Sequence, residues 1–177
     1  TYNFGVDWFI NKKNIIGFKI DGGPGSYNSN GNGTNTITQY NNLGFEHLNA
    51  IVYTPDKWKT NNYNINAEHH FDTTGTVLNF TSDYTRLSEN YSSNIQNYYL
   101  EVNNKEILLV NIYCSDNLNT TEIFASKIDF SKNIDSKSSF ESGAKASFIN
   151  TNNNYLFERK DNLSGNYAKD TSLTNNY

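Results

Sequence analysis

The sequence predicts an all-β fold built from antiparallel strands, and two observations support this prediction. Helix-favouring residues are scarce, because Asn alone accounts for 32 of the 177 residues and is a weak helix former. Aromatic residues make up 15% of the chain. In several segments they alternate with polar residues, which is the period of a strand with one apolar face.

Composition and charge exclude several classes of protein. No apolar stretch approaches the roughly 18 residues of a transmembrane helix. A single cysteine, Cys114, excludes a disulfide scaffold and a cysteine-rich zinc site. The net charge of −4 argues against a nucleic-acid-binding protein. The high aromatic content argues against a disordered chain.

The alternating segments form three predicted hairpins, each with two arms and a short polar turn. The first hairpin turns at Asn11-Lys12-Lys13-Asn14, the second at Asp72-Thr73-Thr74-Gly75, and the third within residues 131–138. The six arms cover residues 2–10, 16–20, 63–71, 78–84, 124–130 and 140–148. Between hairpins the period is lost, so we expect long loops over residues 22–61, 86–121 and 150–176.

Short turns that alternate with long loops are typical of a transmembrane β-barrel, and arms of about 9–10 residues suit a tilted strand crossing a bilayer. Alternation is equally common in a soluble antiparallel sheet, so the pattern leaves both folds open. In a barrel, charged positions would face a wet interior: Asp7, Lys19, Glu68, Asp83, Lys127, Asp129, Glu141 and Lys145. The predicted lipid-facing residues are Tyr2, Phe4, Val6, Phe80, Phe124, Phe130, Phe140 and Phe148. Aromatic residues near arm ends would form interfacial girdles: Tyr2, Trp8, Phe71, Tyr84 and Phe130.

The first hairpin carries a motif of a known family. Residues 5–17 read Gly-x-Asp-Trp-Phe-x-Asn-Lys-Lys-Asn-x-Ile-Gly, which resembles a hairpin of TonB-dependent-receptor-like outer-membrane proteins of Bacteroidota. Three later segments resemble the same family in the same order: residues 63–84, 123–130 and 141–153. The resemblance therefore spans nearly the whole chain apart from the expected loops.

The resemblance implies that residues 1–177 are a partial β-barrel domain, a central segment of a longer receptor with a barrel of about 22 strands. Six arms are too few to close a barrel, since single-chain barrels begin at about eight strands. The implied location is the bacterial outer membrane. The implied partners are outer-membrane lipid, the remaining strands and plug of the receptor, the TonB system, and a surface lipoprotein or another outer-membrane subunit. The plug and the energy-coupling segment are not among these residues.

Few residues suggest chemistry. In Glu68-His69-His70 the two histidines point to opposite faces of a strand, so they cannot chelate one ion together. No nucleophile elbow or isolated carboxylate pair occurs, so we expect no enzyme activity, no cofactor and no metal. Trp58, in an expected outer loop, is the candidate ligand-binding residue.

Two alternatives to the receptor are compatible with the same sequence. One is a soluble secreted β-sandwich binding module, a lectin or an adhesin. The other is a structural barrel subunit of a larger outer-membrane complex. The ligand of a receptor is not indicated by the sequence.

Overall fold

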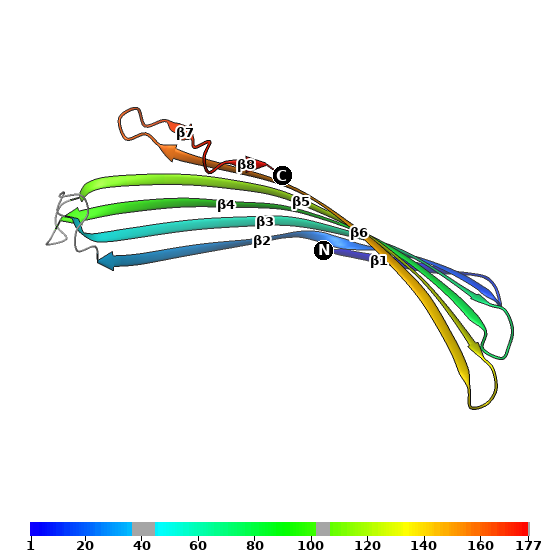
Figure 1. Ribbon diagram of the computed structural model, residues 1–177. Helices are drawn as coiled ribbons and strands as arrows, with labels where there is room; N and C mark the ends of the chain where they lie inside the picture. Colours follow the sequence, from blue (N-terminus) through cyan, green and yellow to red (C-terminus); the bar gives the residue numbers. More distant parts are fainter. Residues whose placement is uncertain (37–44, 102–106, 177) are drawn as a thin grey trace. The chain divides into compact units, whose positions relative to one another are not determined.

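The computed structural model describes residues 1–36, 45–101 and 107–176 as a single antiparallel sheet. Seven strands lie side by side in chain order, and the short last strand β8 pairs with β6 (Figure 1). The strands are β1 (Tyr2–Asn11), β2 (Asn14–Thr36), β3 (Phe45–His70), β4 (Val77–Glu101), β5 (Ile107–Asn133), β6 (Ser139–Lys160), β7 (Tyr167–Lys169) and β8 (Asn175–Asn176). The all-β antiparallel prediction is confirmed.

The chain divides into two units. The first, which we call the turn unit, consists of Thr1–Pro24, Lys59–Ser88 and Thr120–Thr151 and contains the three predicted turns. The second, which we call the C-terminal unit, consists of Gly25–Trp58, Glu89–Asn119 and Asn152–Tyr177. Strands β2 to β6 each contribute residues to both units.

The β1–β2 hairpin shows why the alternating arms pair as predicted. Its register places Phe4 opposite Ile20 and Val6 opposite Phe18 on one face. Gly5 lies opposite Lys19 on the other face. The turn is closed by the Asn11 side chain, whose Oδ1 accepts hydrogen bonds from the Lys13 amide and the Asn14 side chain, each at 2.8 Å. The sequence therefore predicted the hairpin, its turn and its two faces correctly.

The predicted long loops are wrong for most of their length. Strand β2 continues to Thr36, β4 to Glu101 and β6 to Lys160, and the five strands β2–β6 are 22 to 27 residues long rather than 9 to 10. Part of the first two predicted loops lies outside the described residues. Polar residues occupy both faces over much of these extensions, and an apolar run occupies both faces at residues 107–110 of β5. The extensions therefore form strands without the alternation by which strands are recognised in a sequence.

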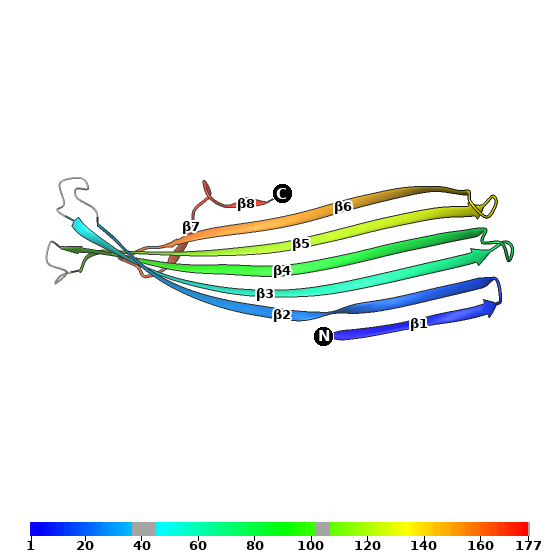
Figure 2. The same cartoon turned by 90° about the horizontal axis from the view of Figure 1, so that it is seen from below.

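The described residues of each unit form no apolar core. Among the described residues Leu100 is the one buried hydrophobic side chain. The views in Figures 1 and 2 show a sheet one layer thick in each unit, without the second layer that a β-sandwich requires. No described segment is a helix capable of spanning a membrane.

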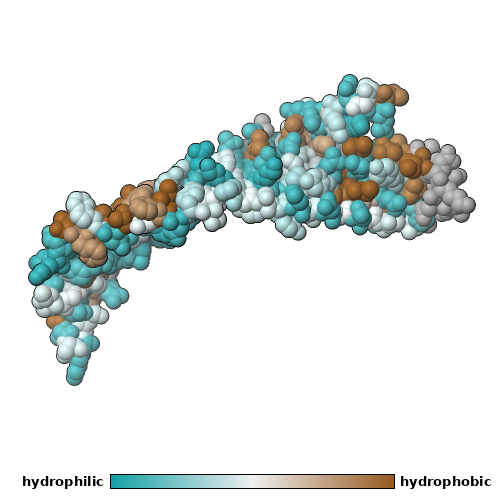
Figure 3. Space-filling view, turned by 180° about the vertical axis from the view of Figure 1, so that it is seen from behind, coloured by the Kyte–Doolittle hydropathy of each residue, from teal (hydrophilic) through white to brown (hydrophobic). Residues whose placement is uncertain are grey.

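The turn unit nevertheless exposes many large apolar side chains, and Figure 3 shows such residues gathered over this unit. Phe4 is 61% exposed, Trp8 67% and Phe148 69%. A chain dissolved in water rarely exposes such a large contiguous apolar surface, so another apolar medium or surface must cover this face.

Candidate functional site

The opposite face of the turn unit is a polar surface joined by hydrogen bonds between strands. Lys19 forms an ion pair with Asp21 at 3.0 Å, and the Asn62 side chain donates to Asp21 at 2.8 Å. Thr85 in turn donates to the Asn62 amide oxygen at 2.9 Å. These contacts run across β2, β3 and β4 in one line.

Further contacts extend this polar surface to the neighbouring strands. The Asn64 side chain donates to Asp83 at 2.7 Å, and Lys127 pairs with Asp129 at 2.7 Å. At Gly143 a Cβ atom would crowd the Asp129 carboxylate, so β6 approaches that carboxylate closely. Of the predicted wet-face residues, Lys19, Lys127 and Asp129 form ion pairs on this surface, and Asp83 accepts a hydrogen bond there.

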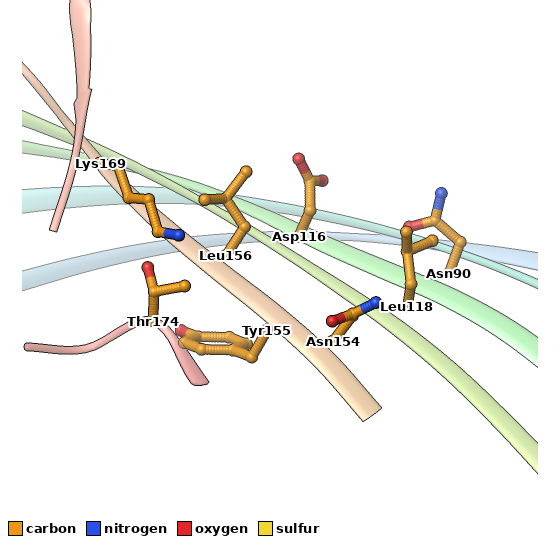
Figure 4. Close-up of a pocket in the computed structure, with 8 residues that line it drawn as sticks. All are labelled: Asn90, Asp116, Leu118, Asn154, Tyr155, Leu156, Lys169 and Thr174. Atoms are coloured by element: carbon orange, nitrogen blue, oxygen red, sulfur yellow. The ribbon is translucent and has the colours of Figure 1, made fainter. Parts of the chain in front are cut away.

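The C-terminal unit contains a cavity of about 390 Å³ (Figure 4). Strand β4 contributes Asn90, β5 contributes Asp116 and Leu118, and β6 contributes residues 154–156. The chain after β6 (residues 161–176), which we call the C-terminal segment, adds Lys169 of β7 and Thr174, which precedes β8. The lining therefore combines a carboxylate, an ammonium group, two amides, a phenol and a hydroxyl with two leucine side chains.

Thr174 anchors the C-terminal segment at the cavity. Its Oγ1 lies 3.1 Å from the Phe157 amide nitrogen, from which it accepts a hydrogen bond, and 3.4 Å from the Phe157 carbonyl oxygen. Strand β8 then pairs Asn175 with Tyr155 and Asn176 with Asn154. The cavity therefore depends on the return of the chain along β6.

Asp170 closes the turn between β7 and β8. Its carboxylate accepts hydrogen bonds from the Ser172 amide at 3.0 Å, from the Ser172 hydroxyl, and from Arg159 Nε at 2.9 Å. The Ser172 hydroxyl, the Ser172 amide and the Arg159 charge together hold the pKa of the Asp170 carboxyl below its usual value. The Arg159 guanidinium also lies over the Tyr113 ring, 5.7 Å from its centroid.

The charged groups inside the cavity are available to a ligand. Asp116 accepts one hydrogen bond, from the Ser92 hydroxyl at 2.6 Å, which leaves its second oxygen open. Lys169 has no ion-pair partner among the described residues. The arrangement suits binding of a small polar ligand with an apolar portion, because it offers donors, acceptors and leucine side chains together.

The sequence-predicted candidate, Trp58, does not line this cavity. Trp58 lies in β3 rather than in a loop, and it is half-buried. Its indole rests against Gly25 of β2, where any Cβ atom would overlap the ring. The structure thus places Trp58 in cross-strand packing, and a ligand role for it stays a prediction.

The two histidines point to opposite faces, as the sequence predicts. His69 Nδ1 lies 2.7 Å from the Asn14 side-chain oxygen and its ring contacts Phe71 edge-on, whereas His70 Nε2 contacts Glu68. The described residues contain no group of three or more His, Cys, Asp or Glu side chains placed to hold a metal ion.

Sequence reasoning missed the cavity residues because they fall in segments expected to be loops. Asp116, Lys169 and Thr174 carry no motif in the sequence. The cavity forms only when β7 and β8 return along β6, so no local signal could have grouped these residues.

Comparison with known families agrees with the architecture. The model of the outer membrane protein beta-barrel family matches residues 69–177, which is more than half of the chain. The match begins at the last two residues of β3 and includes the second turn, β4, the third hairpin, and β7 and β8. No curated protein matches the chain. The chain therefore belongs to the outer membrane protein beta-barrel family, and its strands form part of a barrel wall in the bacterial outer membrane.

Proposed function

We propose that this wall belongs to a TonB-dependent receptor-like transporter, which takes a ligand from outside the cell and passes it through the barrel without covalent chemistry. The observation that carries the proposal is the polar face of the turn unit, where ion pairs and amides line three or more neighbouring strands. Such a face suits the aqueous or plug-filled interior of a wide barrel. The family motif in residues 5–17 supports the same class.

Further strands must complete the barrel. In the turn unit β1 pairs only with β2, and residues 139–151 of β6 pair only with β5 among the described strands. Each unpaired backbone group in the hydrocarbon region would cost several kcal/mol. We propose that other strands of the same receptor occupy both edges, and that its plug fills the interior. An inner-membrane energy-coupling protein would drive transport, and a surface lipoprotein is the expected outer partner.

The cavity of the C-terminal unit is the proposed first contact for the ligand. Asp116 and Lys169 would bind groups of opposite charge, and Leu118 and Leu156 would cover an apolar part. We expect Asp116→Asn to weaken capture of a transported nutrient. The control is Asp135→Asn, which removes a carboxylate from the turn between β5 and β6 and should leave capture unchanged.

The import role is tested by deleting the gene in the bacterium that encodes it. The strain is grown with iron chelates, vitamins, glycans or peptides as the single limiting nutrient, beside a strain without its TonB protein. The proposal expects both strains to lose growth on the same nutrient. Parental growth on every nutrient would contradict it. A strain that is only more sensitive to detergent would indicate a structural barrel subunit instead.

A further inference from the structure

The three turns of the turn unit form a positively charged rim. We define the turn rim as residues 11–14, 71–76 and 131–138. It carries four exposed lysines, Lys12, Lys13, Lys132 and Lys137, and two aspartates, Asp72 and Asp135. The whole chain has a net charge of −4, so the rim has the opposite sign to the rest of the molecule.

The carboxylates of the two rim aspartates accept hydrogen bonds from residues of their own turns. Asp72 accepts hydrogen bonds from the amide and hydroxyl of Thr74, at 2.9 and 2.8 Å, and from those of Thr76, at 3.1 and 2.6 Å. Asp135 accepts from the Lys137 amide at 2.8 Å. Among the described residues none of the rim lysines forms an ion pair with a carboxylate. Their charge is therefore available to an outside anion.

The rim is held together by contacts between turns. Lys13 Nζ donates to the Phe71 carbonyl at 2.8 Å, and the His70 amide donates to the Lys13 carbonyl at 2.8 Å. On the other side the Asn133 side chain donates to the Thr74 carbonyl at 2.8 Å. Hydrogen bonds thus connect the first and third turns, which carry the lysines, through the second turn. This connection lowers the entropy lost when the lysines bind a common surface.

A row of three aromatic rings begins in the rim at Phe71 and continues beside it with Phe130 and Phe140. Phe130 contacts Phe71 with ring centroids 6.3 Å apart, and it contacts Phe140 at 6.4 Å. Phe71 is 47% exposed and Phe140 51%. Exposed aromatic rings next to lysines are the combination found at the boundary between acyl chains and headgroups, where the rings enter the apolar layer and the ammonium groups remain at its polar surface.

We propose that the turn rim binds the phosphate groups of anionic phospholipids in the leaflet that the turns face. Lys12, Lys132 and Lys137 supply the charge, while Phe71, Phe130 and Phe140 fix the depth of the rim. The inference rests on the outer-membrane barrel and not on the import role. An acidic periplasmic protein would be attracted by the lysines but gives no reason for the exposed aromatic row, so a lipid surface fits both features.

The test uses the full-length protein reconstituted in phosphatidylcholine membranes that contain spin-labelled lipid. The fraction of immobilised label is measured for phosphatidylglycerol and for phosphatidylcholine. One variant combines Lys12→Gln, Lys132→Gln and Lys137→Gln, and leaves Lys13 in place because it bonds the Phe71 carbonyl. The matched control combines Lys57→Gln, Lys59→Gln and Lys145→Gln, three exposed lysines outside both the rim and the cavity.

We expect the parent and the control to prefer phosphatidylglycerol, and the rim variant to lose up to about fivefold in relative association for each lysine that reaches a headgroup. Added salt should reduce the preference of the parent, whereas millimolar inorganic phosphate at constant ionic strength should not compete. A parent without preference, equal losses in both variants, or competition by free phosphate would overturn the proposal. Assembly of the rim variant into the outer membrane is measured as a control, because it shows that the substitutions leave the barrel intact.

Discussion

The turn unit and the C-terminal unit share strands β2 to β6, but they differ in the residues that their two faces carry. In the turn unit apolar residues such as Phe4, Val6 and Phe80 alternate with polar residues such as Asn3, Asp7 and Asn79. In the C-terminal unit β4 carries Ser92, Asn94 and Gln96 on one face, where they bond to one another or to β5.

The difference lies in the alternation of apolar and polar residues. Alternation is needed only where one face meets hydrocarbon and the other meets water. A strand with water on both sides keeps its backbone ladder and can exchange apolar side chains for hydrogen-bonding ones. The turn unit therefore has the alternation expected of a membrane-spanning wall. The C-terminal unit lacks it, and its polar side chains occur together with exposed apolar ones such as Ile51, Ile107 and Leu118.

A charge on the apolar face of the turn unit is the most damaging change that we predict. Phe80→Arg should destabilise the assembled protein by about 2–4 kcal/mol if position 80 lies at the bilayer midplane. Asn79→Arg, one residue away on the polar face, should cost far less. Both are measured as urea midpoints and heat modifiability of the full-length protein in membranes. Equal stability of the Phe80→Arg variant and the parent would mean that this face does not contact lipid.

The C-terminal unit should be sensitive to packing rather than to charge. Gly25→Ala places a methyl group against the Trp58 indole, so we expect a loss of about 1–3 kcal/mol and a shift in Trp58 fluorescence. Gly33→Ala is the control, since a Cβ atom at Gly33 meets no neighbour within 4 Å. If both variants behave alike, the indole does not rest on Gly25.

The sequence predicted the parts of the fold in which local chemistry is decisive. Hairpins were recognisable because Phe4, Val6 and Trp8 alternate with polar residues and because Asn11 and Asp72 occupy turns whose amides they can bind. The strand extensions were missed because residues such as Ser92 and Asn94 have no period and favour loops equally well.

The candidate site could not be predicted for a different reason. Trp58 was selected for its large ring, but the ring's place depends on Gly25, which lies 33 positions earlier and pairs with it only in the folded sheet. Lys169 and Asp116 line one cavity from different strands, whose register no local pattern specifies. Contacts between residues far apart in the sequence, rather than residue type, determine both the position of the Trp58 ring and the lining of the cavity.

The stability of the turn unit should decrease in acid because of a carboxylate in its second turn. Hydrogen bonds from the hydroxyl and amide of Thr76, and then from Thr74, hold the pKa of the Asp72 carboxyl far below its usual value. The ionised form is therefore favoured by folding. Its contribution is complete at neutral pH, begins to fade below about pH 4, and is lost as the pH falls through the lowered folded value. Asp72→Asn should be less stable than the parent at neutral pH, with a smaller difference in acid. Parallel stability curves for the two proteins would contradict this role.

The smallest predicted effect concerns the C-terminal segment. Asp170→Asn weakens the contacts to Arg159 and Ser172, so amides of β7 and β8 should exchange hydrogen several-fold faster while those of the turn unit remain unchanged. Hydrogen-exchange mass spectrometry measures both regions at once. The docking role of Asp170 would be disproved by unchanged exchange of residues 167–176.

The central claim is that alternate residues of the turn unit face lipid and water. It is tested most directly by placing single cysteines at positions 123–130 of the full-length protein, with Cys114 replaced by serine and any other cysteine removed, and attaching a spin label. In membranes, collision with oxygen reports lipid and collision with a nickel chelate reports water. We predict oxygen maxima at Phe124, Ser126, Ile128 and Phe130 and nickel maxima at the residues between them. Profiles without a period of two would contradict the account.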